Sequence, residues 1–384
     1  MKTQNGILNY SLLIFGSLLM LTISCAKDEM LAPIPEYYSA IAAGGFHTLA
    51  LEPDGTLWAW GDNSYGQLGD GTFDVKRRPV KIGTGYSVIS AGIYYSLAIK
   101  ADGALWAWGL NENGELGDST TINKNSPVQI GVGYSSISAG NNHSLALKTD
   151  STLWAWGNNS SGQVGNNSYT DQNWPIEIGS DYTAIDGGGL HTIALKSDGS
   201  LWAWGANNTG QLGDGTTVDK KTPVKIGSGY SMIAAGGIHS LALKTDSSLW
   251  AWGSNWYGQI GNGTNEYSNI SPTNIGSGFT MIDAADFNPN FGFLGDGNSL
   301  ALKTDGTLWA CGSNNKGKLG DGTEINRHTL VLIGSGYNKI IAGPSHSLAL
   351  KPDGTLWAWG SNEYGQLGDG TTEDRNRPVQ IVGQ

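Results

Sequence analysis

Short runs of apolar residues alternate with polar turns along most of the chain. The segment 86–133 contains four such runs, separated by Gly- and Asp-rich turns and one long polar loop: 86–92, 96–100, 105–109 and 127–130. Short runs of β-branched, aromatic and small residues between turn residues predict strands. The Asp102-Gly103 pair between the second and third runs indicates a hairpin. The segment therefore predicts four short antiparallel strands.

The third predicted strand of each unit carries the sequence Leu-Trp-Ala-Trp. Successive side chains in a strand point to opposite faces, so the two Trp share one face and Leu and Ala share the other. Neither face is polar, which predicts a sheet that is buried on both sides. The large Trp face of one sheet can then pack on the small Leu and Ala face of the next.

This unit recurs seven times. The tetrapeptide Trp-Ala-Trp-Gly begins at six positions: Trp58, Trp106, Trp154, Trp202, Trp250 and Trp357. A variant in which Cys311 replaces the second Trp begins at Trp309. The units fill the chain without gaps: 38–85, 86–133, 134–181, 182–229, 230–278, 279–336 and 337–384. Seven four-stranded antiparallel units predict an all-β, seven-bladed β-propeller over 38–384. Whether the terminal strands complete one blade between them stays open.

The composition agrees with a packed β protein. The chain has 58 Gly and 15 Trp, and only 14% of its residues are charged. So many aromatic residues exclude a disordered chain. The net charge of −11 disfavours a nucleic-acid partner. The two cysteines exclude a disulfide framework, and Cys311 is expected to be a buried free thiol.

The first residues have the pattern of a secretory signal. One charge, Lys2, precedes an apolar run at 12–23 that is too short to cross a bilayer. The run ends at Ser24-Cys25, which resembles a bacterial lipobox, and the following Ala-Lys-Asp-Glu resembles the surface-export signal of Bacteroidota lipoproteins. We expect a signal peptide at 1–24, lipidation of Cys25, a tether at 25–37, and an outer-membrane, surface-exposed location. The alternative is a plain signal peptide with an incidental cysteine.

The repeat unit runs Gly-x-x-His-Ser-Leu-Ala-Leu-Lys-x-Asp-Gly-x-Leu-Trp-Ala-Trp-Gly-x-Asn-x-x-Gly-Gln-Leu-Gly-Asp-Gly-Thr. It is most complete from His239 to Gly263 and from His346 to Thr371. This pattern resembles the repeat of the regulator of chromosome condensation family over 38–384, and the resemblance implies a seven-bladed propeller. Known members act in nucleotide exchange on a small nuclear GTPase, chromatin binding, ultraviolet-B reception and β-lactamase inhibition. Fold alone therefore does not assign a function.

Several of these functions fit the residues poorly. An exported chain would not meet a nuclear GTPase, and the acidic segment after Cys25 does not favour chromatin. Plant photoreceptors of this family use Trp in the turn before the repeat His. The matching positions here carry no Trp: Gly45, Ile93, Asn141, Gly189, Gly237 and Pro344.

Five histidines occupy one repeat position: His47, His143, His191, His239 and His346. Tyr95 and Asn298 take this position in the other two units. A ring of metal ligands is one interpretation, but packed sheets lie too far apart for bonds of about 2 Å. We favour a structural hydrogen bond made once per blade, and expect no metal and no cofactor.

The Gly-Asp-Gly-Thr loops at Asp70, Asp214, Asp321 and Asp369 are interpreted as turns, because they lack the ligand spacing of a calcium site. No nucleophile elbow, phosphate-binding loop or zinc-protease helix motif occurs. We therefore expect a protein that is not an enzyme.

Residues that break the repeat are the candidates for function. The sixth unit has a long insertion within 286–298 that contains Phe287, Phe291 and Phe293; it forms either a binding finger or a loop tucked onto its own blade. Other aromatic residues stand in an otherwise polar turn: Tyr65, Trp256, Tyr257 and Tyr364. Exposed aromatic side chains favour binding of proteins or glycans.

The sequence thus predicts a monomeric, non-enzymatic envelope lipoprotein that binds a protein or glycan and contacts the membrane only through its lipid. The alternative is a regulator of a small GTPase similar to the exchange factors of the family.

Overall fold

The computed structural model describes residues 37–264, 266–285 and 297–382. The predicted signal peptide, Cys25, the predicted tether up to residue 36 and the three insertion phenylalanines lie outside the described residues. Within the described part, the chain forms seven four-stranded sheets that lie in a compact unit spanning Pro33–Gln384.

Each sheet is built from one continuous stretch of chain, and its strands are hydrogen-bonded in chain order. Blade 1 contains β1 (Ala40–Ala43), β2 (His47–Leu51), β3 (Leu57–Gly61) and β4 (Lys76–Gly83). Blade 2 contains β5 (Tyr86–Ala91), β6 (Tyr95–Lys100), β7 (Leu105–Gly109) and β8 (Lys124–Gly131). Blade 3 contains β9 (Tyr134–Ala139), β10 (His143–Lys148), β11 (Leu153–Gly157) and β12 (Gln172–Gly179).

The remaining blades follow the same plan. Blade 4 contains β13 (Tyr182–Gly187), β14 (His191–Lys196), β15 (Leu201–Gly205) and β16 (Lys220–Gly227). Blade 5 contains β17 (Tyr230–Ala235), β18 (His239–Lys244), β19 (Leu249–Ser254) and β20 (Ser268–Gly276). Blade 6 contains β21 (Phe279–Ala284), β22 (Asn298–Lys303), β23 (Thr307–Gly312), a short 3-10 helix η2 (Asn315–Gly317) and β24 (Arg327–Ser335). Blade 7 contains β25 (Lys339–Ala342), β26 (His346–Leu350), β27 (Leu356–Gly360) and β28 (Arg375–Ile381).

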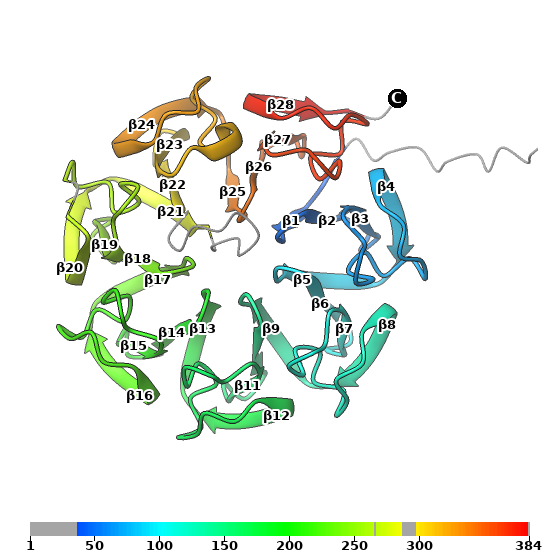
Figure 1. The fold of residues 1–384 in the computed structure, drawn as a ribbon, viewed down its shortest axis with the longest axis horizontal. Coiled ribbons are helices and arrows are strands. Elements are labelled where there is room, and N and C mark those ends of the chain that lie inside the picture. Colours follow the sequence, from blue (N-terminus) through cyan, green and yellow to red (C-terminus); the bar gives the residue numbers. More distant parts are fainter. Residues whose placement is uncertain (1–36, 265, 286–296, 383–384) are drawn as a thin grey trace, which may run out of the picture. The chain divides into compact units, whose positions relative to one another are not determined.

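The seven sheets are arranged around a central axis, and the first strand of each blade lies innermost (Figure 1). All strand pairs within the blades are antiparallel, for example Leu49 opposite Ala59 in blade 1. The prediction of a seven-bladed propeller with four-stranded antiparallel blades is confirmed. No helix long and apolar enough to cross a membrane occurs in the described part of the chain.

The outer strands are longer than the sequence predicts. The fourth apolar run of the second unit covers 127–130, but β8 begins at Lys124, which pairs with Gly109. The extra residues are polar because this strand lies at the sheet edge, where apolar alternation is not required. Pro127 fits within it because an edge strand leaves one row of amides unpaired.

The packing between blades follows from the two faces of the third strand. Leu57 and Ala59 of β3 share one apolar cluster with Trp106 and Trp108 of β7. Trp108 is fully buried. The Trp face of one blade therefore packs on the small face of its neighbour, as the alternation predicts. Burial of a large side chain contributes about 1.5–3 kcal/mol.

The ring closes without strand exchange between the termini. Blade 7 packs on blade 1 through a cluster that includes Leu356, Ala358 and Trp60. The Trp60 indole donates a hydrogen bond to the Gln366 carbonyl, 2.9 Å away, and the Tyr38 amide donates to the Gly354 carbonyl at 2.9 Å. This seam uses the same kind of contacts as the other seams.

Candidate functional site

Each histidine of the repeat joins two blades. His47 Nε2 lies 2.9 Å from the Ser96 hydroxyl of the next blade. That hydroxyl donates to the Gln67 carbonyl at 2.8 Å, and the Trp108 indole donates to the same oxygen at 2.8 Å. Because the serine proton is used on the carbonyl, the histidine must donate through Nε2–H, which fixes its tautomer.

The other four histidines repeat this bond to a Ser or Thr of the following blade: His143 to Thr192, His191 to Ser240, His239 to Ser299, and His346 to Thr48. All five rings are fully buried. Burial lowers the pKa of each ring to about 3. The histidines are therefore neutral structural links. No group of three or more His, Cys, Asp or Glu side chains in the described segments is placed to hold a metal ion.

The Gly-Asp-Gly-Thr loops are held by protein donors. Asp70 Oδ1 accepts from the Thr72 amide at 2.9 Å and the Thr72 hydroxyl at 2.8 Å, and its other oxygen lies 3.4 Å from Lys76 Nζ. Burial acts to raise the pKa of Asp70, but these hydrogen bonds and Lys76 lower it overall. Asp214, Asp321 and Asp369 make equivalent turns and ion pairs. Since protein donors occupy both carboxylate oxygens, the loops are turns.

We call the face of the propeller at which β2 begins and β3 ends the loop face. On this face, a row of aromatic side chains crosses three neighbouring blades. Tyr364 of blade 7 lies 5.0 Å from Phe46 of blade 1 between ring centroids, and Phe46 lies 6.5 Å from Tyr94 of blade 2. Tyr94 in turn lies 5.0 Å from Tyr65. Phe46 is buried, and the three tyrosines are half-buried. The aromatic row, defined by these four residues, thus consists of three half-buried tyrosines and one buried phenylalanine.

The row contains two residues that sequence reasoning missed. Phe46 and Tyr94 directly precede the repeat His or its Tyr replacement, a position that differs in every blade: Phe46, Tyr94, Asn142, Leu190, Ile238, Gly297 and Ser345. That variability was the available signal. Among the described residues, Phe46 and Tyr94 join Tyr65 to Tyr364, the two tyrosines that the sequence singled out.

The other predicted aromatic residues lie apart from the row. Trp256 is 53% exposed and its ring lies 5.0 Å from that of Tyr267 in an edge-on arrangement. Tyr257 is half-buried, and its amide donates to Gln259 Oε1 at 3.0 Å. These residues belong to blade 5, and no ring contact joins them to the row among the described residues. The described loop face therefore carries aromatic residues on blade 5 as well as in the row.

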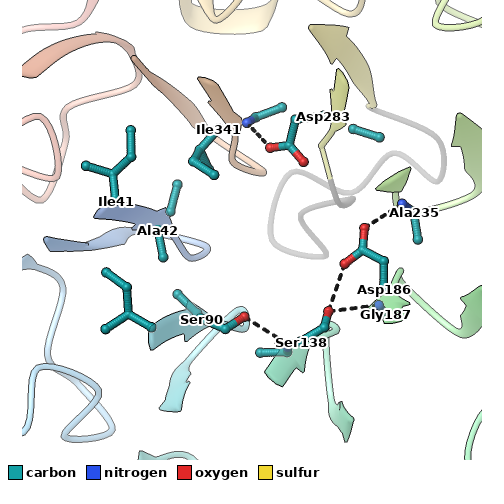
Figure 2. A pocket seen from close by; sticks show the side chains of 15 residues that line it. Ile41, Ala42, Ser90, Ser138, Asp186, Gly187, Ala235, Asp283 and Ile341 are labelled. Carbon is teal, nitrogen blue, oxygen red and sulfur yellow. Dashed lines mark hydrogen bonds between the residues drawn. The ribbon is translucent and has the colours of Figure 1, made fainter. Parts of the chain in front are cut away.

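A polar site lies on the central axis of the ring, where the innermost strands of the seven blades line a cavity that we call the axial channel (Figure 2). Asp186 of β13 accepts from the Ser138 hydroxyl and from the Ala235 amide, each at 2.8 Å. Asp283 of β21 accepts from the Ala342 amide at 2.6 Å. Each carboxyl thereby links its blade to the next one.

Burial controls the charge of both acids. It raises the pKa of Asp186 to about 6 against the opposing effect of its hydrogen bonds. It raises the pKa of Asp283 to about 8, and the charge of Asp186 contributes in the same direction. Sequence reasoning missed this pair, although each acid departs from the neutral residues that the other blades carry at this repeat position.

Cys311 is buried, as expected from its replacement of a seam Trp. Its Sγ lies 3.5 Å from the Gln259 carbonyl, the acceptor that a Trp indole uses at other seams. Burial raises the pKa of the thiol to about 12. A buried thiol with so high a pKa is a packing residue.

Family models match most of the chain. The model described as RCC1-like domain matches residues 24–288. Models of the regulator of chromosome condensation (RCC1) repeat match 353–384, and also 293–318 and 339–366. A human E3 ubiquitin-protein ligase, HERC2, is 45% identical over 42 residues, which is 11% of this chain and 1% of the ligase.

Two solved structures share the fold. Human WBSCR16 is 21% identical with a TM-score of 0.75, over 85% of this chain and 94% of that chain. Prp20p of Saccharomyces cerevisiae, described together with its binding to Gsp1p and histones, is 23% identical with a TM-score of 0.76 over 88% of each chain. At these identities the likeness concerns the fold.

Proposed function

The chain belongs to the RCC1-like domain family, and we propose that it is a non-enzymatic binding protein of the cell envelope. The observation that carries this proposal is the aromatic row. Tyr364, Phe46, Tyr94 and Tyr65 form one continuous set of ring contacts across three blades. The fold itself does not require them, since blades 3 and 4 have polar or aliphatic residues at the same places: Asn142, Ser161, Leu190 and Thr209.

The chemistry of the row suits a protein or a glycan. A tyrosine ring supplies a large apolar contact together with a hydroxyl that can donate or accept a hydrogen bond. Aromatic residues around a buried centre are the usual energetic focus of a binding surface. Phe46 is the buried member of the row, between Tyr364 on one side and Tyr94 on the other.

The envelope location rests on the first 25 residues. If Cys25 carries the lipid, the propeller is held at a membrane and meets partners outside the cytoplasm. Metabolic labelling with palmitate, compared between the native chain and Cys25→Ser, tests this step. Label on the native chain and none on the variant supports the anchor, and absence of label on both removes it.

The binding role is tested by removing the rings. A Tyr65→Ser, Tyr94→Ser double variant should lose binding on a glycan array or in affinity capture from envelope extracts. Trp174→Ser is the matched control, because Trp174 is 52% exposed on β12 and outside the row. A separate variant with Phe287, Phe291 and Phe293 changed to Ala tests the insertion. Retained binding in the tyrosine double variant contradicts the proposal.

Exchange activity on a small GTPase is the second candidate function. Its support is the RCC1-like domain match together with the fold likeness to Prp20p, whose description names Gsp1p. Release of fluorescent GDP from Gsp1p, or from small GTPases of the source organism, measures this activity directly. Accelerated release by the chain would favour this function over the binding role.

A further inference from the structure

Two cavities adjoin within the axial channel. The smaller, about 150 Å³, lies among the innermost strands of all seven blades. The larger, about 390 Å³, lies where β1, β17, β21 and β25 begin, toward the face opposite the loop face. Ile41, Asp283 and Ile341 line both cavities. The two cavities therefore meet at a stretch of channel wall that includes Asp283.

The larger cavity has a mainly apolar wall. Met232 and Met281 line it from adjacent blades, together with Ile233, Ile282 and Ile340. The two methionines share one repeat position, at which the other blades carry different residues: Ala40, Val88, Ser136, Ala184 and Lys339. Methionine side chains are flexible and polarizable, so they adapt to apolar groups of varied shape. The volume falls in the range of small-molecule sites, about 300–1,000 Å³.

The smaller cavity has an acidic wall. Asp186 and Asp283 share one repeat position, at which the other blades carry neutral residues: Ala42, Ser90, Ser138, Ala234 and Ile341. Figure 2 shows the two carboxyl groups on the channel wall, each tied to the next blade. Ser90 makes the same link with a hydroxyl, which accepts from the Ala139 amide at 3.0 Å. A neutral side chain is thus sufficient for the structural contact.

We propose that the axial channel binds a small amphipathic molecule that carries a protonated amine at one end and an apolar body. The amine sits at Asp283, with Asp186 further along the channel, and the apolar body packs on Met232 and Met281. Lys339 is the one cationic side chain lining the two cavities, and its Nζ donates to the Ser39 carbonyl. When both acids are ionised, the described channel wall carries two negative charges against the one positive charge of Lys339, which favours a cation.

Binding of the amine is coupled to the protonation of Asp283. Burial raises the pKa of Asp283 because a carboxylate there is poorly solvated. The carboxyl therefore holds its proton at neutral pH. A cation beside it stabilises the charged form, so binding of the amine releases this proton. This site is independent of the aromatic row, which lies on the loop face.

The test uses n-hexylammonium as the probe, titrated into the full-length chain and followed by saturation-transfer NMR. Hexanoate and 1-hexanol are the comparators, because they keep the alkyl chain and change only the head group. We expect the amine to bind at least about tenfold more tightly than either, a difference of about 1.4 kcal/mol. Equal or tighter binding of hexanoate or 1-hexanol overturns the proposal without any variant.

Two variants locate the probe. Asp283→Asn keeps an oxygen for the Ala342 amide and removes the charge, so hexylammonium affinity should fall about tenfold while 1-hexanol affinity is unchanged. Asp74→Asn is the matched control, since the Asp74 side chain is 81% exposed and outside the channel. A melting curve for each variant verifies folding. Undiminished amine binding by folded Asp283→Asn contradicts the assignment, and Tyr94→Ser should leave amine binding intact.

Discussion

The seams between blades and the loop face above them differ in how strictly they keep the repeat. At the seams, one backbone carbonyl per blade accepts from a hydroxyl of the next blade in all seven cases. The same carbonyl accepts from a Trp indole in six of these seams. On the loop face, the residue before the repeat His differs in every blade.

This difference separates what the fold needs from what it leaves free. A seam residue is buried between two sheets, so a change removes packing and hydrogen bonds together. On the loop face, the three tyrosines of the aromatic row are half-buried, and Phe46 between Tyr364 and Tyr94 is buried. We infer that the aromatic residues of the row on blades 7, 1 and 2 serve binding as well as packing.

The largest effect is expected at a regular seam. Trp204 is fully buried and its indole donates to the Gln163 carbonyl at 2.9 Å. Trp204→Ala should reduce the free energy of unfolding by about 3–5 kcal/mol in a denaturant titration. Trp174→Ala, which removes an exposed ring from the edge of blade 3, should change it by less than about 0.5 kcal/mol. If both variants lose a similar free energy of unfolding, seam residues are no more important for stability than surface residues.

A smaller loss is expected when the seam hydrogen bonds alone are removed. Thr192→Val keeps the side-chain shape but deletes the hydroxyl between His143 and the Gln163 carbonyl. The buried His143 Nε2–H then has no acceptor, which should cost about 1–3 kcal/mol of unfolding free energy. Thr183→Val is the control on an exposed position of the same blade. If Thr192→Val is as stable as the native chain, the hydrogen bonds from His143 to Thr192 and from Thr192 to the Gln163 carbonyl do not contribute to stability.

The irregular seam between blades 5 and 6 tests how packing compensates for a lost Trp. A Cβ on Gly261 would lie 3.0 Å from Cys311 Sγ and 3.7 Å from Leu330 Cγ, whereas Gly213 at a regular seam faces the Trp252 ring. Leu330 stands where the other outer strands have Pro. Cys311→Trp should therefore overpack this seam and cost about 1–3 kcal/mol.

The compensation itself is measured by a double-mutant cycle. Adding Leu330→Pro to Cys311→Trp should restore part of the lost stability, because the Trp ring then takes the space that Leu330 vacates. Strictly additive losses in the denaturant midpoint would mean that the two residues vary independently.

The channel acids should make stability depend on pH. The folded pKa of Asp283, about 8, lies above the value of 3.8 for an unperturbed aspartate. The native state therefore keeps a proton that the unfolded state has released, and stability falls as pH rises from about 4 to 8. Asp283→Asn should remove part of this fall. Its melting temperature relative to the native chain should rise by about 4 °C or more between pH 5 and pH 9, and a constant difference would contradict the assignment.

The architecture could be predicted because the same four-strand pattern recurs seven times along the sequence. The Leu-Trp-Ala-Trp strand sets both the strand period and the two complementary faces. The packing of Ala59 of blade 1 with Trp108 of blade 2 therefore follows from alternation. The aromatic row could not be predicted, because Tyr364 meets Phe46 only when the ring closes. The channel acids were equally hidden, since the sequence does not state that the first strand of each blade faces an axis.

We propose that the aromatic row is the binding surface, and photo-crosslinking can show whether a partner contacts it. The most direct measurement replaces Tyr65 or Tyr94 with the photo-reactive analogue p-benzoylphenylalanine and irradiates native cell envelopes. The same analogue at Tyr169, which is 54% exposed on blade 3 outside the row, is the control. A discrete adduct from positions 65 and 94 and none from position 169 is the expected result. Adducts from position 169 alone, or equally from all three positions, would contradict the claim.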